Sequence, residues 1–183
     1  MMSELIIHPN MKQQGFTLVE LLIFMAIYSV LIVILTGIFV SIIDVKLRSE
    51  ATSDVQTDAN YILARLDYDF SQASAISLPA ILGTPANTLR LTVNGNNYTY
   101  TLNQGNLELQ TNIDTNSLNS YNTTVSDFNV LRLGNTGGKN AVKISFTLTS
   151  TIADNNQFEV KNFSSTLGIR WKNILKDKRW LVF

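Results

Sequence analysis

One carboxylate in an apolar stretch is the first feature of this sequence that could do chemistry. Glu20 is the only ionisable residue in residues 16–43, and the stretch ends at Asp44, Lys46 and Arg48. An uncompensated carboxylate inside a membrane costs up to ~3 kcal/mol, and less near the membrane edge. Glu20 therefore needs a cationic partner, which makes a functional role our first interpretation. The alternative is a carboxylate that reaches the lipid headgroups from a helix end.

The apolar stretch itself predicts a membrane-spanning helix. At 1.5 Å per residue, residues 16–43 would form a helix of roughly 42 Å, longer than the ~30 Å hydrocarbon core of a bilayer. An ordinary secretory signal has a shorter apolar region and is cleaved after it. Gly37 lies inside this helix and is a candidate point for local melting, because glycine costs ~1 kcal/mol relative to alanine in a helix. A glycine that lipid simply tolerates is the alternative.

A short polar leader precedes the apolar stretch and ends at Gly15, after which the chain continues Phe16-Thr17-Leu18-Val19-Glu20. Three features coincide here: a glycine–phenylalanine junction, a glutamate five places after the glycine, and a long apolar helix. This combination resembles the prepilin signal of type IV pilins and type II secretion pseudopilins. The resemblance covers the leader and the apolar stretch.

The resemblance implies a processing step and a role for the carboxylate. A prepilin peptidase would cut between Gly15 and Phe16, and Phe16 would become an N-methylated N-terminus. Glu20 would then attract the N-terminal amine of a neighbouring subunit during filament assembly. Other pilin or pseudopilin subunits, the membrane and an inner-membrane assembly platform are the implied partners. The N-terminus would be cytoplasmic, and the head would be exported from the inner membrane into a periplasmic or extracellular filament.

Composition narrows the remaining function classes. The chain has 183 residues, with 14 basic and 14 acidic side chains, so bulk charge does not indicate a nucleic-acid partner. Cysteine is absent, and His8 in the leader is the only histidine. Once the leader is removed, histidine- or cysteine-dependent catalysis and the usual zinc sites are excluded by inventory. We therefore expect no enzyme activity, no cofactor and no metal site.

The rest of the chain predicts an α+β fold in which the long helix packs on an antiparallel β-sheet head. Beyond the apolar stretch, the helix becomes amphipathic, with one apolar face at spacings of three and four. That face comprises Leu47, Ala51, Val55, Ala59, Leu63, Leu66, Phe70 and Ala73. The opposite face carries Arg48, Glu50, Asp54, Asp58, Arg65, Asp67 and Asp69. The expected division is a leader at 1–15, a transmembrane helix at 16–43, an amphipathic helix at 44–76 and a β-rich head at 77–183.

Alternating apolar residues and turn signals indicate the strands of the head. Residues 77–88 contain Pro79, Gly83 and Pro85, which predict a loop. A three-stranded meander is expected at 89–93, 98–102 and 107–110. Residues 111–124 are rich in Asn, Thr and Ser, and we expect an exposed loop. Further strands are expected at 128–133, 141–149, 157–163 and 165–171.

Two other sets of residues could bind a ligand. A basic and aromatic tail, which includes Trp171 and Trp180, could bind single-stranded DNA or anionic lipid, but a contact with a neighbouring subunit is the favoured interpretation and nucleic acid the disfavoured one. Its cations are Arg170, Lys172, Lys176, Lys178 and Arg179. Asp114, Asp127 and the turn at 154–156 offer oxygens for calcium, yet no twelve-residue loop pattern is present and turns favour Asp and Asn in any case.

These observations together indicate a structural subunit. Residues 64–73 also resemble the helix end of PilW-like and J-type minor pilins. We expect a minor pilin or pseudopilin that helps to initiate, cap or assemble a pilus-like filament. A J-type pseudopilin of type II secretion or a competence pseudopilus component is the alternative within the superfamily. A single-pass anchored surface binding protein or adhesin is the alternative from another class.

Overall fold

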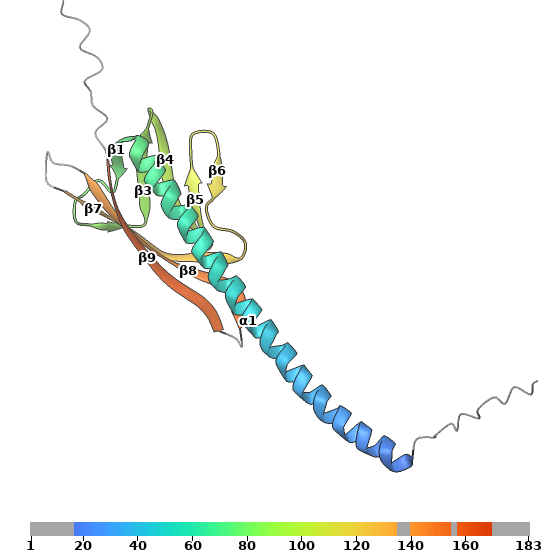
Figure 1. Ribbon diagram of the computed structural model, residues 1–183. Helices are drawn as coiled ribbons and strands as arrows, with labels where there is room; N and C mark the ends of the chain where they lie inside the picture. The colour runs from blue at the N-terminus through green and yellow to red at the C-terminus, as the bar shows by residue number, and fades with distance from the viewer. Residues whose placement is uncertain (1–16, 135–139, 155–156, 170–183) are drawn as a thin grey trace, which may run out of the picture. The chain divides into compact units, whose positions relative to one another are not determined.

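One long helix begins the described part of the protein. The computed structural model describes residues 17–134, 140–154 and 157–169. Helix α1 runs over Leu18–Gln72, 55 residues without a break (Figure 1). The chain divides into two compact units, Met1–Ile43 and Asp44–Phe183, and α1 contributes to both.

In the second unit, one stripe of α1 is buried. Ala51, Val55, Ala59, Leu66 and Phe70 are all 4% exposed or less, and their spacings of four and seven keep them on one helix face, as the sequence predicts. The centre of the stripe differs from the prediction, because Ile62 is fully buried whereas Leu63 is only half-buried.

The amphipathic helix was predicted to reach residue 76, and this is wrong. Helix α1 ends at Gln72, and strand β1 (Ala73–Leu78) follows at once. Ala73 and Ile76 are both buried, because a register shift between Ala73 and Ala75 brings residues three apart to the same side of the strand. Antiparallel pairing with β3 supplies the backbone hydrogen bonds that a further helical turn would have made.

Five strands form the first antiparallel sheet, in the order β1-β3-β4-β5-β6. After β1, its strands are β3 (Thr88–Val93), β4 (Asn96–Asn103), β5 (Asn106–Gln110) and β6 (Thr115–Ser117). The predicted meander is β3-β4-β5 and is confirmed. Its two tight turns have positive φ at both central residues, 51° and 82° at Asn94 and Gly95 and 47° and 82° at Gln104 and Gly105. Such turns match the twist of a hairpin.

Four strands form the second sheet, in the order β2-β7-β8-β9. They are β2 (Pro85–Ala86), β7 (Thr123–Leu133), β8 (Ala141–Asp154) and β9 (Gln157–Gly168). Apart from β2, the strands are much longer than those of the first sheet and pair along most of their length (Figure 1).

Three boundaries in the head differ from the sequence prediction. The predicted exposed loop at 111–124 contains β6 and the start of β7, and Leu118 and Asn119 within it are buried. The predicted loop at 77–88 contains β2. The two strands predicted at 157–163 and 165–171 are a single strand, β9, which pairs with β8 through Phe163, Ser164 and Ser165 without interruption. In each case pairing with another strand decides the structure, and for β2 that strand is the distant β7.

A single hydrophobic core lies between the second half of α1 and the two sheets. Side chains from α1, β1, β3, β4, β5, β7 and β8 contribute to it, together with Leu118. Tyr100, Phe70 and Phe146 are its largest fully buried members. Phe163 of β9 extends the core by stacking on Phe146, with ring centroids 5.6 Å apart. The observed fold is therefore the α+β arrangement that the sequence predicts.

Candidate functional site

The start of α1 is a capped helix end. The backbone N–H of Glu20 donates to Thr17 Oγ1 at 3.3 Å, and the N–H of Leu21 donates to the Thr17 carbonyl oxygen at 3.2 Å. Thr17 is thus the N-cap, and Glu20 is the third helical residue. Thr-x-x-Glu before an apolar stretch is the sequence signature of a capping box. The sequence analysis missed this signal, although it lies inside the stretch that it singled out.

The Glu20 carboxylate itself has no partner among the described residues: none of them donates a hydrogen bond to it or forms an ion pair with it. Its place in the first turn is favourable for a negative charge, because the amide groups of a helix N-terminus carry partial positive charge. That interaction is worth less than about 1 kcal/mol at an exposed site. The carboxylate therefore still requires a cation if an apolar environment surrounds it.

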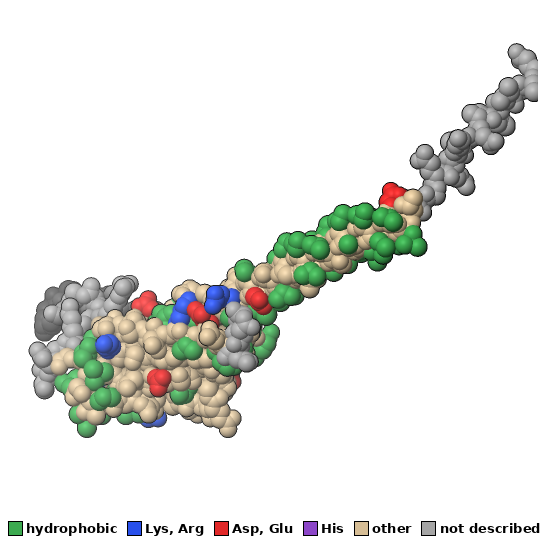
Figure 2. All heavy atoms as spheres, turned by 90° about the horizontal axis from the view of Figure 1, so that it is seen from below, with side chains coloured by type: hydrophobic (Ala, Val, Ile, Leu, Met, Phe, Trp, Pro, Cys, Tyr) green, Lys and Arg blue, Asp and Glu red, His purple; other side chains and the backbone are tan. Residues whose placement is uncertain are grey.

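Every described residue of the first unit, from Thr17 to Ile43, is exposed. Hydrophobic side chains cover this part of α1, including Phe24, Val33 and Phe39 at 65%, 72% and 64% exposure (Figure 2). By length and composition the helix could cross a membrane. Such a surface is stable only when lipid or other apolar side chains cover it.

Three serine and threonine hydroxyl groups within this apolar segment donate to the helix itself. Ser29 Oγ donates to the Ala26 carbonyl oxygen at 2.8 Å, and Thr36 Oγ1 donates to that of Ile32 at 2.9 Å. Ser41 does the same to Gly37 at 3.0 Å. These three hydroxyls therefore need no further partner in an apolar setting, and the carboxylate that does need one stands at the N-terminal end of the segment.

Gly37 leaves α1 unbroken, because the helix is continuous through it. A Cβ atom built at this position would meet nothing within 4 Å. Close packing within this chain therefore does not require the glycine. Melting of the helix at Gly37 on assembly stays a prediction.

The other predicted site residues at the chain ends lie outside the described residues. These are the leader, the proposed junction at Gly15 and Phe16, and the basic tail. The tail cations concerned are Arg170, Lys172, Lys176, Lys178 and Arg179.

Of the calcium candidates, Asp114 and Asp127 lie in different elements, and residues 155 and 156 of the turn at 154–156 lie outside the described residues. Asp114 sits in the turn between β5 and β6, where it accepts hydrogen bonds from the Thr115 N–H at 2.8 Å and from Asn116 Nδ2 at 3.1 Å. Asp127 lies in β7, where its Oδ2 accepts from Thr147 Oγ1 at 3.3 Å. Among the described residues, no group of three His, Cys, Asp or Glu side chains could hold a metal ion.

Two acidic residues that were expected on the outer face of α1 instead attach the helix to the head. Asp58 Oδ2 accepts hydrogen bonds from the Ser120 N–H at 2.9 Å, from Ser120 Oγ at 2.8 Å and from Thr123 Oγ1 at 2.5 Å. Asp54 Oδ2 accepts from Asn122 Nδ2 at 2.9 Å. The helical spacing could have shown part of this, because Asp58 is three residues from Val55 and so borders the buried stripe.

A third acidic residue, Asp69, was also expected outside and is 1% exposed. Its Oδ2 accepts a hydrogen bond from the Tyr100 hydroxyl of β4 and pairs with Arg65 Nε at 3.0 Å. Burial, and then the hydrogen bond to Asp69, raises the pKa of Tyr100 far above its ordinary value. The hydroxyl therefore stays protonated and holds the last turn of α1 to the first sheet.

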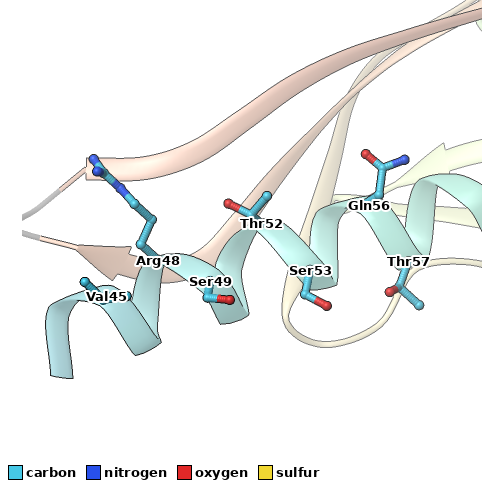
Figure 3. Close-up of a pocket in the computed structure, with 7 residues that line it drawn as sticks. All are labelled: Val45, Arg48, Ser49, Thr52, Ser53, Gln56 and Thr57. Carbon is cyan, nitrogen blue, oxygen red and sulfur yellow. The ribbon is translucent and has the colours of Figure 1, made fainter. Parts of the chain in front are cut away.

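A hydroxyl-rich hollow of about 610 Å³ runs along α1 in the second unit. In Figure 3, Arg48, Thr52 and Gln56 extend to one side of the helix, and Ser49, Ser53 and Thr57 to the other. Val45 completes the lining, and Arg48 is its only ionisable member. The hollow therefore lacks an acid–base pair of the kind that hydrolytic chemistry requires.

Comparison with known proteins agrees with the site at the start of α1. Residues 10–36 match the prokaryotic N-terminal methylation motif. A search of curated proteins and a search of solved structures gave no match. The matched residues contain the capped helix start, Glu20 and most of the exposed apolar surface, and they support the assignment of this chain to the superfamily of type IV pilins and pseudopilins.

Proposed function

We propose that this protein is a minor pilin or pseudopilin. It is a structural subunit that helps to initiate, cap or assemble a pilus-like filament, and it is not an enzyme. A prepilin peptidase removes its leader, and the apolar half of α1 first anchors it in the inner membrane and then packs against other subunits. An inner-membrane assembly platform is the machine that would move it between these states.

One observation carries the proposal: the carboxylate of Glu20 stands at the capped start of an exposed apolar helix and has no partner among the described residues. A cleaved N-terminal amine on Phe16 of another subunit would bring a cation to a similar depth. An ion pair formed in a dry environment is favourable only when each charge has its partner, so it couples assembly to processing.

The β-rich head and the resemblance of residues 64–73 favour a minor subunit of PilW-like or J-type character. A J-type pseudopilin of type II secretion and a competence pseudopilus subunit are narrower versions of the same proposal. The genes that neighbour this one would separate these systems.

Processing is the first test. The full-length precursor is expressed with and without a prepilin peptidase, and the N-terminus of the purified protein is determined by mass spectrometry. We expect peptidase-dependent loss of residues 1–15. Gly15→Val should leave the precursor uncut, because a β-branched side chain prevents close backbone approach at the junction.

The matched control is Gly37→Val, which places the same side chain in open space within α1 and should not affect trimming. An N-terminus that stays intact in the presence of an active peptidase would contradict the proposal. It would favour the anchored surface binding protein or adhesin instead.

A further inference from the structure

A polar hollow of about 370 Å³ lies on the outer face of the five-stranded sheet. Its lining comes from β3, β4, β5 and the turn after β5, and consists of Arg90, Asn97, Thr99, Gln110, Thr111 and Asn112. The pairings Arg90↔Thr99 and Thr99↔Gln110 place three of these residues in one row across the strands. The opposite face of β3 carries Leu89 and Leu91, which are fully buried in the core.

The guanidinium of Arg90 is the one charged group in this lining. Arg90 is half-buried, and its Nε donates to Thr99 Oγ1 at 3.1 Å. Thr99 is 8% exposed and forms the floor of the hollow. Among the described residues, no carboxylate pairs with Arg90, and its two terminal nitrogens donate to no acceptor.

Three other cations of the second unit, by contrast, already have acceptors within the chain. Arg65 pairs with Asp69, and Lys161 pairs with Glu159 at 3.3 Å. Arg132 donates to the Pro79 carbonyl oxygen at 3.0 Å and to Asn140 Oδ1 at 3.1 Å. A half-buried guanidinium with two unused donor nitrogens in a hollow is by contrast ready for an external acceptor.

The remaining side chains of the lining are neutral, and they can both donate and accept hydrogen bonds. The side-chain amides of Asn97 and Gln110 have no hydrogen-bond partner among the described residues. Asn112 Nδ2 donates to Asn96 Oδ1 at 2.9 Å, which leaves its own carbonyl oxygen available. Thr111 is occupied within its turn, where its Oγ1 donates to the Asp114 carbonyl oxygen at 3.1 Å. Amides of this kind match the hydroxyl groups of a polyol, which also donate and accept.

We propose that this hollow is a binding site for a sugar acid, with the carboxylate on Arg90 and the ring hydroxyls on Asn97 and Gln110. The planar fork of a guanidinium matches a carboxylate in bidentate geometry. A single cation neutralises a monocarboxylate, whereas a phosphate dianion would keep excess charge. The volume lies within the range of small-ligand sites. The site does not depend on filament assembly.

Titration of the full-length precursor in detergent micelles with galacturonate tests this, with binding followed by calorimetry. Galactose, which lacks the carboxylate, and acetate, which lacks the hydroxyls, are the paired ligand controls. We expect galacturonate to bind at least about tenfold more tightly than either, because only it engages both parts of the site. A galacturonate oligosaccharide separates the two sources of the ligand: tighter binding than the monomer indicates a polysaccharide, and weaker binding indicates a free sugar acid.

Variants locate the site. Arg90→Gln should weaken galacturonate binding at least about tenfold, and Arg90→Lys should weaken it less. Gln110→Ala, at an exposed position, should weaken it without affecting folding and keeps the test decisive if the Arg90 variants unfold. Lys143→Gln removes one exposed positive charge from the other sheet and should leave binding unchanged.

Three results would overturn the proposal. One is galacturonate binding no more tightly than galactose, and another is equal binding of acetate and galacturonate. The third is unchanged affinity in folded Arg90→Gln. Loss of leader processing would affect the proposed filament role but none of these measurements, so the two proposals fail independently.

Discussion

The acidic side chains in the two halves of α1 differ in whether the head supplies them with a hydrogen-bond partner. In the second unit, Asp54, Asp58 and Asp69 each accept a hydrogen bond from a residue of the head. In the first unit, Glu20 has no such partner among the described residues, although its surroundings are the more apolar of the two. The head satisfies these acidic side chains of the second half, whereas the carboxylate of the first half has no partner in the described part of the chain.

The difference extends to the apolar side chains. The stripe from Ala51 to Phe70 is buried by the chain's own sheets, whereas the apolar residues from Leu18 to Ile43 are exposed. Burial of a stripe stabilises a folded head, and an exposed all-round apolar surface favours lipid or other subunits. The same regular helix thus packs on the head in one part and carries an exposed apolar surface in the other, where the proposed function places assembly.

The largest effect should come from Glu20→Ala. Membrane insertion, trimming and head stability should stay as in the parent, while incorporation into filaments should be lost, because only the intermolecular pairing is removed. Incorporation is measured by immunoblotting of sheared filaments. Glu50→Ala, at an exposed position of the same helix in the second unit, is the matched control. Normal incorporation of Glu20→Ala would remove the pairing role.

Ile62→Ala, unlike Glu20→Ala, should lower the stability of the head. Ile62 is fully buried in the core, so truncation should reduce the free energy of unfolding by about 2–5 kcal/mol through lost burial and a residual cavity. The free energy is obtained from urea unfolding followed by circular dichroism. Ile38→Ala makes the same change at a position that is 53% exposed in the first unit. Equal destabilisation by both variants would contradict the contrast between the two halves.

Asp58→Ala should lower the free energy of unfolding by about 2–3 kcal/mol. Its Oδ2 accepts three hydrogen bonds from Ser120 and Thr123, and removal leaves these donors short of a partner. Asp67→Ala, at an exposed position of the same helix, should change stability by less than about 0.5 kcal/mol. Both values come from urea unfolding at neutral pH. Equal effects would show that Asp58 does not attach the helix to the head.

Tyr100→Phe should have the smallest effect, about 1–2 kcal/mol at neutral pH, from loss of the hydrogen bond to Asp69. The pKa of Tyr100 is raised on folding from an ordinary value of 10.0. Its contribution is therefore fully present below about pH 10 and decreases as the pH rises further, since the unfolded chain loses this proton first.

Urea unfolding at about pH 9 and about pH 11 measures this linkage. The parent should lose more stability across that interval than Tyr100→Phe does. Tyr68→Phe changes an exposed tyrosine of α1 and should follow the parent. Identical pH dependence in the parent and Tyr100→Phe would contradict the raised pKa.

Local sequence patterns were sufficient to predict much of the structure of this protein. The helical conformation of the long apolar stretch, the buried stripe through Val55 and Leu66, and the β3-β4-β5 meander are confirmed as predicted. Each depends on neighbours in sequence, because a helix repeats every 3.6 residues and a tight turn is specified by its own residues. The capping box at Thr17 was equally local and was overlooked.

Tertiary structure decided the element boundaries and side-chain partners that local sequence patterns left open. The pairing of β1 with β3 ended α1 at Gln72, and the pairing of β8 with β9 made one strand where two were expected. Asp58 and Asp69 face the head because residues far away in sequence supply their donors, 62 or 65 positions on for Asp58 and 31 for Asp69. A sequence states which groups need partners, and only the folded chain brings those partners within hydrogen-bonding distance.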